Sequence, residues 1–230
     1  MRRVRVVFGY VLLSLLAAVM LLLATWIGQP ASAALSALER SVIALAFMGS
    51  CALGIFLASR SYGASTGRGR RGALNANKGT IRGLIGHHPD CGRFSSSVIL
   101  VRGRARCAGC LGLAIGCAFS LALMGAFVLM PPLGSAWGQW FVLIGLLVVI
   151  FCMLEVAWHP SRPKLHVISN AALVIGFLLV TLGTASATST ILLGLVAILI
   201  CYLWLDTRIQ ISDWRNALVC HSCGQTCKYY

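Results

Sequence analysis

Five side chains that commonly bind metals lie close together in one stretch of the chain, residues 84–110. They are His87, His88, Cys91, Cys107 and Cys110. Two residues separate His88 from Cys91, and two separate Cys107 from Cys110, and zinc sites are commonly built from two such short-spaced pairs. Gly109 permits a tight backbone turn between the two thiols of the second pair. The spacing therefore predicts a small metal knuckle, in which His87 can substitute for His88.

A second set of metal-binding side chains lies in the C-terminal tail and consists of Cys220, His221, Cys223 and Cys227. Two arrangements stay open: the loop closes its own site and the tail forms a second one, or the tail completes a shared site. Three or four thiolates could also hold an iron–sulfur cluster. We favour zinc as the cofactor, because histidines are mixed with the cysteines and no standard cluster spacing is present. An iron–sulfur cluster is the alternative.

The sequence between and before the ligands predicts little independent structure. Residues 97–101 and 104–106, around Arg102-Gly103, are typical of a short β-hairpin. A loop of this size cannot bury a core of its own, so a metal would supply the folding energy. Residues 60–83 are rich in Gly, Ser and Arg and are predicted to be a flexible basic linker that attracts anionic lipid headgroups. We do not expect nucleic-acid binding, because aromatic residues are not interleaved with the basic ones for base stacking.

The elements that must carry these ligands are membrane helices. Of the 230 residues, 59% are hydrophobic and only 10% are charged, whereas about a quarter of the residues in a soluble domain are charged. Six apolar runs of about 20 residues can each cross a hydrocarbon core of about 30 Å. The runs are residues 6–27, 41–59, 111–130, 137–157, 165–182 and 189–205. The predicted fold is therefore an all-α integral membrane protein with about six transmembrane helices.

The distribution of positive charge predicts how these helices are oriented. With six spans, all but Arg40 of the 19 Lys and Arg residues fall on one side of the membrane, and such residues collect in cytoplasmic loops. We therefore expect a multi-pass protein of the cell membrane whose Cys/His loop and both termini are cytoplasmic. Thiols stay reduced in the cytosol, which makes disulfides the weaker interpretation of the loop cysteines. An aromatic belt at the span ends is predicted for Trp26, Trp137, Trp140, Trp158 and Trp204.

Five regions follow from these patterns. Residues 1–59 hold transmembrane helices 1 and 2, residues 60–83 the linker, residues 84–110 the metal-knuckle loop, residues 111–205 helices 3 to 6, and residues 206–230 an amphipathic segment and the Cys-rich tail. We expect the first run to be an uncleaved anchor, with cleavage after the small residues 31–33 as the alternative. The polar residues 181–190 are expected to form a tight hairpin between the last two spans. Residues 206–219 carry an apolar stripe and are expected to lie along the membrane surface as a helix.

Small residues and cysteines inside the spans have simpler interpretations. Gly112, Gly116 and Ser120 form a small-residue stripe at the start of the third span, which predicts the close approach of another helix. We interpret the cysteines within the helices as small apolar residues that fill the core; these are Cys51, Cys117, Cys152 and Cys201.

The loop also resembles a known signature. A group of small multi-span prokaryotic membrane proteins carries a CHQ or HHPDC element, followed by CARCTG or CAGCTG at the start of a membrane helix. The corresponding residues here are His87-His88-Pro89-Asp90-Cys91, Arg93-Phe94 and Cys107-Ala108-Gly109-Cys110-Leu111-Gly112. Leu111 stands where the signature usually has Thr, and the likeness covers residues 86–116 without the tail cysteines. The resemblance implies a metal-type motif beside the membrane and brings no activity with it.

One acidic residue, Glu155, lies within a predicted span, and an intramembrane carboxylate is a functional candidate for that reason. It can equally snorkel to the surface or pair with Arg162. His159 and His166 lie on the predicted side of the loop and either join its site or cap a turn.

No hydrolase triad, nucleotide-binding loop or Rossmann fingerprint is recognisable, and we favour a protein that is not an enzyme. Its zinc-type site would be structural and would dock protein partners, as in a subunit of a larger membrane complex. The alternatives are a membrane-bound redox metalloprotein, with an iron–sulfur cluster or an open zinc site, and a metal transport or delivery protein.

Overall fold

Six helices and four short strands make up the part of the chain that the structure describes. This computed structural model describes residues 2–27, 34–63, 84–85, 88–89, 97–101, 104–131, 134–158 and 162–221. The helices are α1 (Arg2–Trp26), α2 (Ala37–Gly63), α3 (Ala108–Leu129), α4 (Ser135–Trp158), α5 (Pro163–Thr188) and α6 (Ile191–His221). The strands are β1 (Leu84–Ile85), β2 (His88–Pro89), β3 (Val98–Val101) and β4 (Arg104–Cys107).

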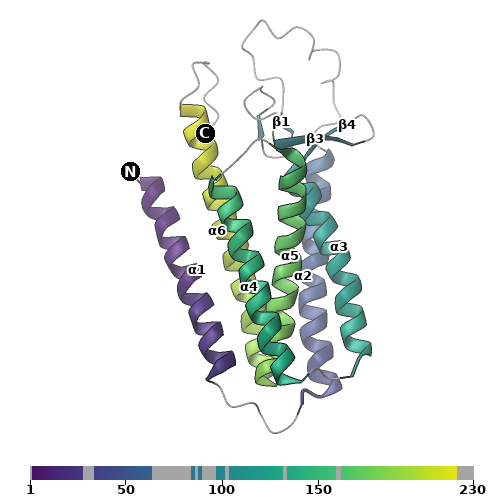
Figure 1. Cartoon of the computed structure of the whole chain (residues 1–230). Helices are drawn as coiled ribbons and strands as arrows, with labels where there is room; N and C mark the ends of the chain where they lie inside the picture. Colours follow the sequence, from purple (N-terminus) through teal and green to yellow (C-terminus); the bar gives the residue numbers. More distant parts are fainter. Residues whose placement is uncertain are drawn as a thin grey trace, which may run out of the picture.

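All six helices are long and apolar enough to cross a membrane, judged by length and composition. The chain is therefore a polytopic membrane protein built on a helical bundle. Figure 1 shows both marked chain ends and the strands at one end of this bundle. We call it the loop end, defined by β3, β4, the first turn of α3 and the last turns of α4 and α6. The other end, where α3, α5 and α1 finish, is called the far end.

The helix at the centre of the packing is α5, which contacts α4 and α3 most extensively and also α6 and α1. Small residues allow these close approaches. A Cβ atom added to Gly116 of α3 would lie 2.7 Å from Ala171 O of α5, and one added to Gly145 of α4 would lie 2.8 Å from Gly176 O. The predicted stripe of Gly112, Gly116 and Ser120 is thus confirmed as a buried helix contact, and its partner is α5.

The last two helices form the expected hairpin, but α5 is longer than predicted. It extends to Thr188, and only Ser189, in a left-handed conformation with φ 51°, and Thr190 separate it from α6. Polar residues do not end the helix early because their hydroxyl groups bond within it, as when Thr188 Oγ1 donates to Thr184 O at 2.7 Å. Small residues in the same segment also pack on α4 around Gly138.

The structure differs from expectation for residues 206–219, which continue α6 without a break to His221. Thr207, Arg208 and Ile211 are buried, whereas Leu218 is exposed. The expected apolar stripe therefore packs partly against other helices rather than lying along a membrane surface. The physical reason is Arg208, whose charge finds its partners inside the bundle.

The predictions for the tryptophans are confirmed in part, and those for the cysteines inside the spans are confirmed. Trp26, Trp137 and Trp140 are exposed at the far end, as an aromatic belt requires. Trp204 is not part of a belt, because it is buried, stacks on Phe177 and donates its indole N–H to Ser14 O at 3.2 Å. The cysteines interpreted as apolar filling are all buried; these are Cys51, Cys117, Cys152 and Cys201.

Candidate functional site

The second cysteine pair of the predicted knuckle lies where a strand meets a membrane helix. The last residue of β4, Cys107, is also the N-cap of α3, and Cys110 lies in the first helical turn. β4 pairs antiparallel with β3, with Val98 opposite Cys107, which confirms the predicted hairpin. Cys107 is buried and Cys110 is half-buried. The first turn of a helix has N–H groups without helical partners and a positive dipole end, so it favours negatively charged thiolate ligands.

Only part of the predicted ligand set falls within the described residues. His88 lies in β2, opposite Ile85 of β1, but nothing is described of its side chain. Cys220 and His221 are the last two residues of α6. Outside the described residues are His87, Cys91, Cys223 and Cys227. Among the residues that are described, no group of three or more His, Cys, Asp or Glu side chains could hold a metal ion.

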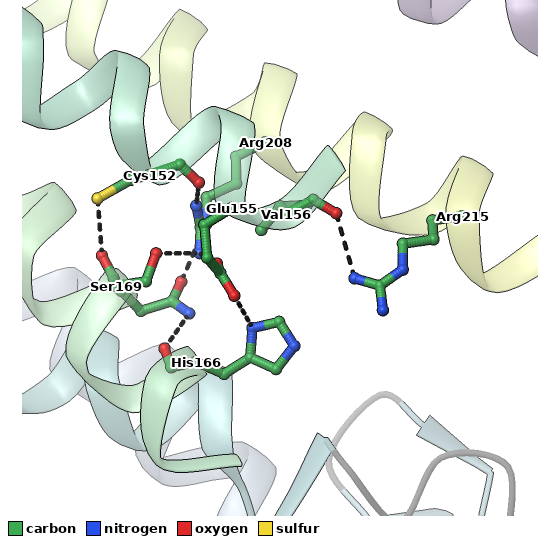
Figure 2. Close-up of polar contacts among 8 residues, drawn as sticks. Cys152, Glu155, Val156, His166, Ser169, Arg208 and Arg215 are labelled. Carbon is green, nitrogen blue, oxygen red and sulfur yellow. Dashed lines mark hydrogen bonds and ion pairs between the residues drawn. The ribbon is translucent and has the colours of Figure 1, made fainter. Parts of the chain in front are cut away.

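A cluster of buried charged side chains lies at the same end of the bundle and joins α4, α5 and α6 (Figure 2). Arg208 Nη2 lies 3.3 Å from Glu155 Oε2, and both side chains are 5% exposed. On the other oxygen, His166 Nδ1 lies 3.0 Å from Glu155 Oε1. That contact is close in distance, but Oε1 accepts no hydrogen bond of standard geometry from the described residues. Glu155 therefore lies between Arg208 on one carboxylate oxygen and His166 on the other.

The guanidinium of Arg208 has further acceptors on two helices. Nη2 donates to Ser169 Oγ at 3.0 Å, Nε donates to Asn170 Oδ1 at 3.2 Å, and Nη1 donates to the backbone oxygen of Cys152. A planar guanidinium spreads five N–H donors over three nitrogen atoms and so reaches acceptors on separate helices, whereas the three donors of a lysine ammonium share a single nitrogen. Buried ion pairs are tolerated when additional hydrogen bonds satisfy the remaining groups. Arg208 meets that condition.

A second arginine of α6 stabilises the end of α4. Arg215 Nη1 donates to Val156 O at 3.2 Å (Figure 2). The residue four positions after Val156 is Pro160, which has no N–H group to offer this carbonyl. Basic side chains commonly bond such unpaired carbonyls at the C-terminal end of a helix. The arginines of α6 thus hold α4 at two successive turns.

The partner proposed for Glu155 from the sequence was wrong, because Arg208 and His166 contact it and Arg162 is exposed. Because the sixth span was predicted to end at residue 205, Arg208 was assigned to the tail and was not considered as a partner of Glu155. A signal was present nonetheless. Glu155 and Arg208 both lie within about one helical turn of the predicted span ends on the same side, and opposite charges at equal membrane depth are expected to pair.

One residue connects the cysteine turn to the charged cluster. Asn170 accepts a hydrogen bond from Arg208 and donates from Nδ2 to His166 O at 2.7 Å. The same side chain borders the turn, since a Cβ added to Gly109 would lie 3.7 Å from Asn170 Nδ2. The first turn of α3 therefore rests on the helix surface that holds the buried charges.

The far end has a buried arginine of a different kind. Arg40, near the start of α2, donates from Nη2 to the backbone oxygens of Phe127 and Met130 at the end of α3. Its guanidinium carbon lies 4.8 Å from the centre of the Phe127 ring. No carboxylate within the described ranges forms an ion pair with it, and the neighbouring Glu39 instead bonds Ser36 at 2.8 Å.

The two regions at the loop end offer different chemistry. The turn of Cys107 and Cys110 presents two thiols at the spacing that a soft metal ion prefers. In the charged cluster both carboxylate oxygens of Glu155 face nitrogen atoms, so the cluster ties three helices together rather than offering an acid to a substrate. Comparisons with family models, with curated proteins and with solved structures return no match for this chain.

Proposed function

We propose that this polytopic membrane protein carries a zinc-type Cys/His site at the loop end, and that the site is structural and docks protein partners. One observation carries the proposal: the β3–β4 hairpin leads Cys107 to the N-cap of α3, with Cys110 in the same turn. Both thiols then belong to one short segment anchored on a membrane helix. The remaining ligands would come from His87, His88 and Cys91 of the loop, or from Cys220, His221, Cys223 and Cys227 of the tail.

The docking role is supported by apolar exposure beside this turn. Leu100 of β3 is 75% exposed, and its neighbour Val101 is also exposed. A small hairpin gains nothing by presenting such side chains to water, whereas the apolar centre of a protein interface uses them. The partner would therefore be a protein that covers this edge of the hairpin, as in a larger membrane complex.

The orientation of the protein in the membrane is part of the same proposal. Arg3, Arg5, Arg106, Arg162 and Arg215 lie on elements that begin or end at the loop end, whereas Arg40 lies at the far end. By the tendency of basic residues to stay inside, the loop end and both termini would be cytoplasmic. The basic linker of residues 60–83 would then meet the anionic headgroups of the inner leaflet. The likeness to the HHPDC and CAGC signature of small prokaryotic membrane proteins agrees with this placement of the motif.

The proposal is tested by the metal content of purified protein, measured by mass spectrometry of the elements together with an absorption spectrum. The variant is Cys107→Ser/Cys110→Ser, and the matched control is Cys51→Ser/Cys117→Ser, which removes the same number of thiols from the membrane core. We expect stoichiometric zinc without colour in the natural protein and in the control, and its loss in the loop variant. Protein that carries no metal, or a loop variant that keeps its metal, would contradict the proposal.

The same measurement separates the two alternatives. Visible charge-transfer bands that disappear in the loop variant would show that the site holds an iron–sulfur cluster instead of zinc, and would favour the redox protein. Metal that is weakly held and exchanges freely would favour transport or delivery. Docking is tested separately: Leu100→Ser should reduce co-purification of a membrane partner while leaving the metal content unchanged.

A further inference from the structure

Two cysteines from different helices face each other inside the bundle, away from the metal-type motif. Cys51 of α2 and Cys117 of α3 are 3% and 4% exposed and belong to the same core. The Sγ atom of Cys117 lies against α2, because a Cβ added to Gly54 would be 3.1 Å from it. Gly54 follows Cys51 by three residues, so both share one face of α2. The thiols of Cys51 and Cys117 are close enough to interact electrostatically.

The helices that carry these thiols flank the Cys/His loop. α2 ends at Gly63 and α3 begins at Ala108, so the whole loop is connected to the bundle through them. They also pack closely against each other. A covalent bond between them would therefore join the two helices about three turns away from the loop. A third thiol, that of Cys201 in α6, is close enough to Cys51 to interact with it electrostatically and is the competing partner.

We propose that Cys51 and Cys117 form an oxidisable dithiol that joins α2 to α3. Oxidation breaks two S–H bonds and forms one S–S bond, and two electrons and two protons pass to the oxidant. An oxidant of the quinone class suits this location, because it dissolves in the bilayer and becomes a quinol by taking up the two electrons and two protons. The product is an uncharged disulfide, which an apolar core accommodates without a hydrogen-bond partner. The proposal is independent of any metal in the loop.

The sequence makes the bond simple to detect. Of the ten cysteines, only Cys51 precedes Lys78, and the lysines of the chain are Lys78, Lys164 and Lys228. Residue 164 is exposed, and in a Lys164→Arg variant a lysine-specific protease cuts after Lys78 and Lys228. Besides the terminal dipeptide, this gives one piece that holds Cys51 alone and one piece that holds the other nine cysteines. A disulfide between these pieces must therefore involve Cys51.

The experiment oxidises the folded, full-length protein in detergent with diamide, whose N=N bond takes up two electrons and two protons. Remaining thiols are then blocked, the protein is denatured and the chain is cut. We expect the two pieces to migrate together on a non-reducing gel and to separate after reduction. Cys117→Ala should abolish the linkage, whereas Cys201→Ala and Cys152→Ala should leave it intact.

Two results would overturn the proposal: pieces that separate after oxidation of the natural thiols, or a linkage that persists in Cys117→Ala and disappears in Cys201→Ala. Size-exclusion chromatography shows whether each variant is folded. Where Cys117→Ala fails to fold, peptide mass spectrometry of the oxidised protein decides, because a Cys51–Cys117 peptide supports the proposal and a Cys51–Cys201 peptide contradicts it.

Discussion

Arg208 at the loop end and Arg40 at the far end are buried to a similar degree, at 4% and 6% exposure, yet their surroundings differ in kind. Arg208 contacts a carboxylate, a hydroxyl, a side-chain amide and a backbone oxygen on two helices. Arg40 contacts two backbone oxygens at the end of one helix and the ring of Phe127. The first is a junction between helices, and the second is a cap.

The difference shows how a buried cation can be neutralised in two ways. The carboxyl end of a helix carries a partial negative charge of about half an elementary unit, and Arg40 uses that end of α3. Arg208 has a full carboxylate, Glu155, which in turn depends on it. Removing Arg208 therefore leaves a buried carboxylate with only the contact from His166 among the described residues, whereas removing Arg40 leaves helix dipoles near the end of α3. Substitution of the two arginines should therefore affect the stability of the protein to different extents.

The largest effect is expected for Arg208→Met. Breaking a buried ion pair by removing one partner costs about 3–5 kcal/mol, and we expect a loss of that size in the free energy of unfolding. SDS-driven unfolding of the purified protein measures it. The double variant Glu155→Gln/Arg208→Met should recover much of the loss, because no charge is left unpaired. A double variant as unstable as the single one would show that the stranded carboxylate is not the cause.

Lysine substitutions should distinguish the two arginines most sharply. Arg208 uses three nitrogens for four acceptors, and Arg40 uses Nη2 for both of its carbonyls. A single ammonium group can serve the second arrangement but not the first. We expect Arg208→Lys to lower the free energy of unfolding by about 2 kcal/mol and Arg40→Lys by less than about 1 kcal/mol, since a typical hydrogen bond contributes about that much. Equal losses in the same unfolding assay would show that the two arginines do not differ in this way.

Replacing Arg40, which caps α3, is expected to lower the free energy of unfolding less than replacing Arg208, which joins helices. In Arg40→Met, two carbonyls lose a charged donor and Phe127 loses a cation over its ring, which together are worth about 1–2 kcal/mol. The thermal midpoint in detergent should fall accordingly. Arg5→Met is the control, because Arg5 is exposed on α1 and its replacement should leave the midpoint unchanged. A loss as large as that of Arg208→Met would mean that Arg40 has a carboxylate partner.

The smallest effect is expected for Arg215→Met. One half-buried carbonyl of α4 loses its donor at a place where water can replace it, so the loss should be about 0.5–1 kcal/mol. Hydrogen exchange of the last turn of α4 should increase while exchange in the centre of α4 stays the same. An unfolding change as large as that of Arg40→Met would show that Arg215 also supports the Glu155 cluster.

The sequence was sufficient to predict the membrane helices, but it was insufficient to predict which buried charged side chains contact each other. Apolar runs locate the spans because the bilayer requires continuous hydrophobic length, and the stripe at Gly112 and Gly116 located a close helix contact. Span ends were less accurate, since Thr184 and Thr188 satisfy their hydroxyl groups within the helix and Arg208 finds its partners inside the bundle. Local hydropathy cannot register such partners, because they come from helices distant in the sequence.

The candidate site was predictable to a similarly limited extent. The spacing of Cys107 and Cys110 and the hairpin before them follow from local chemistry, and the structure has both in one turn. The interior cluster was missed, although Glu155 was recognised as unusual. Its remaining members, His166, Ser169, Asn170 and Arg208, are recognisable only when α5 and α6 are aligned beside α4 at the correct depth.

The Glu155–Arg208 pair also imposes an order on biogenesis. The two residues are 53 positions apart, so α4 leaves the ribosome and meets the insertion machinery while its partner is still being synthesised. A membrane helix with an unpaired charge inserts less readily, by about 2.5–3.5 kcal/mol at its centre and less near the surface. The α5–α6 hairpin has a two-residue connection, and its second helix brings Arg208 back to the depth of Glu155. Glu155 therefore meets its arginine only once α6 is in place, and until then His166 of α5 is the basic side chain that the described residues place against it.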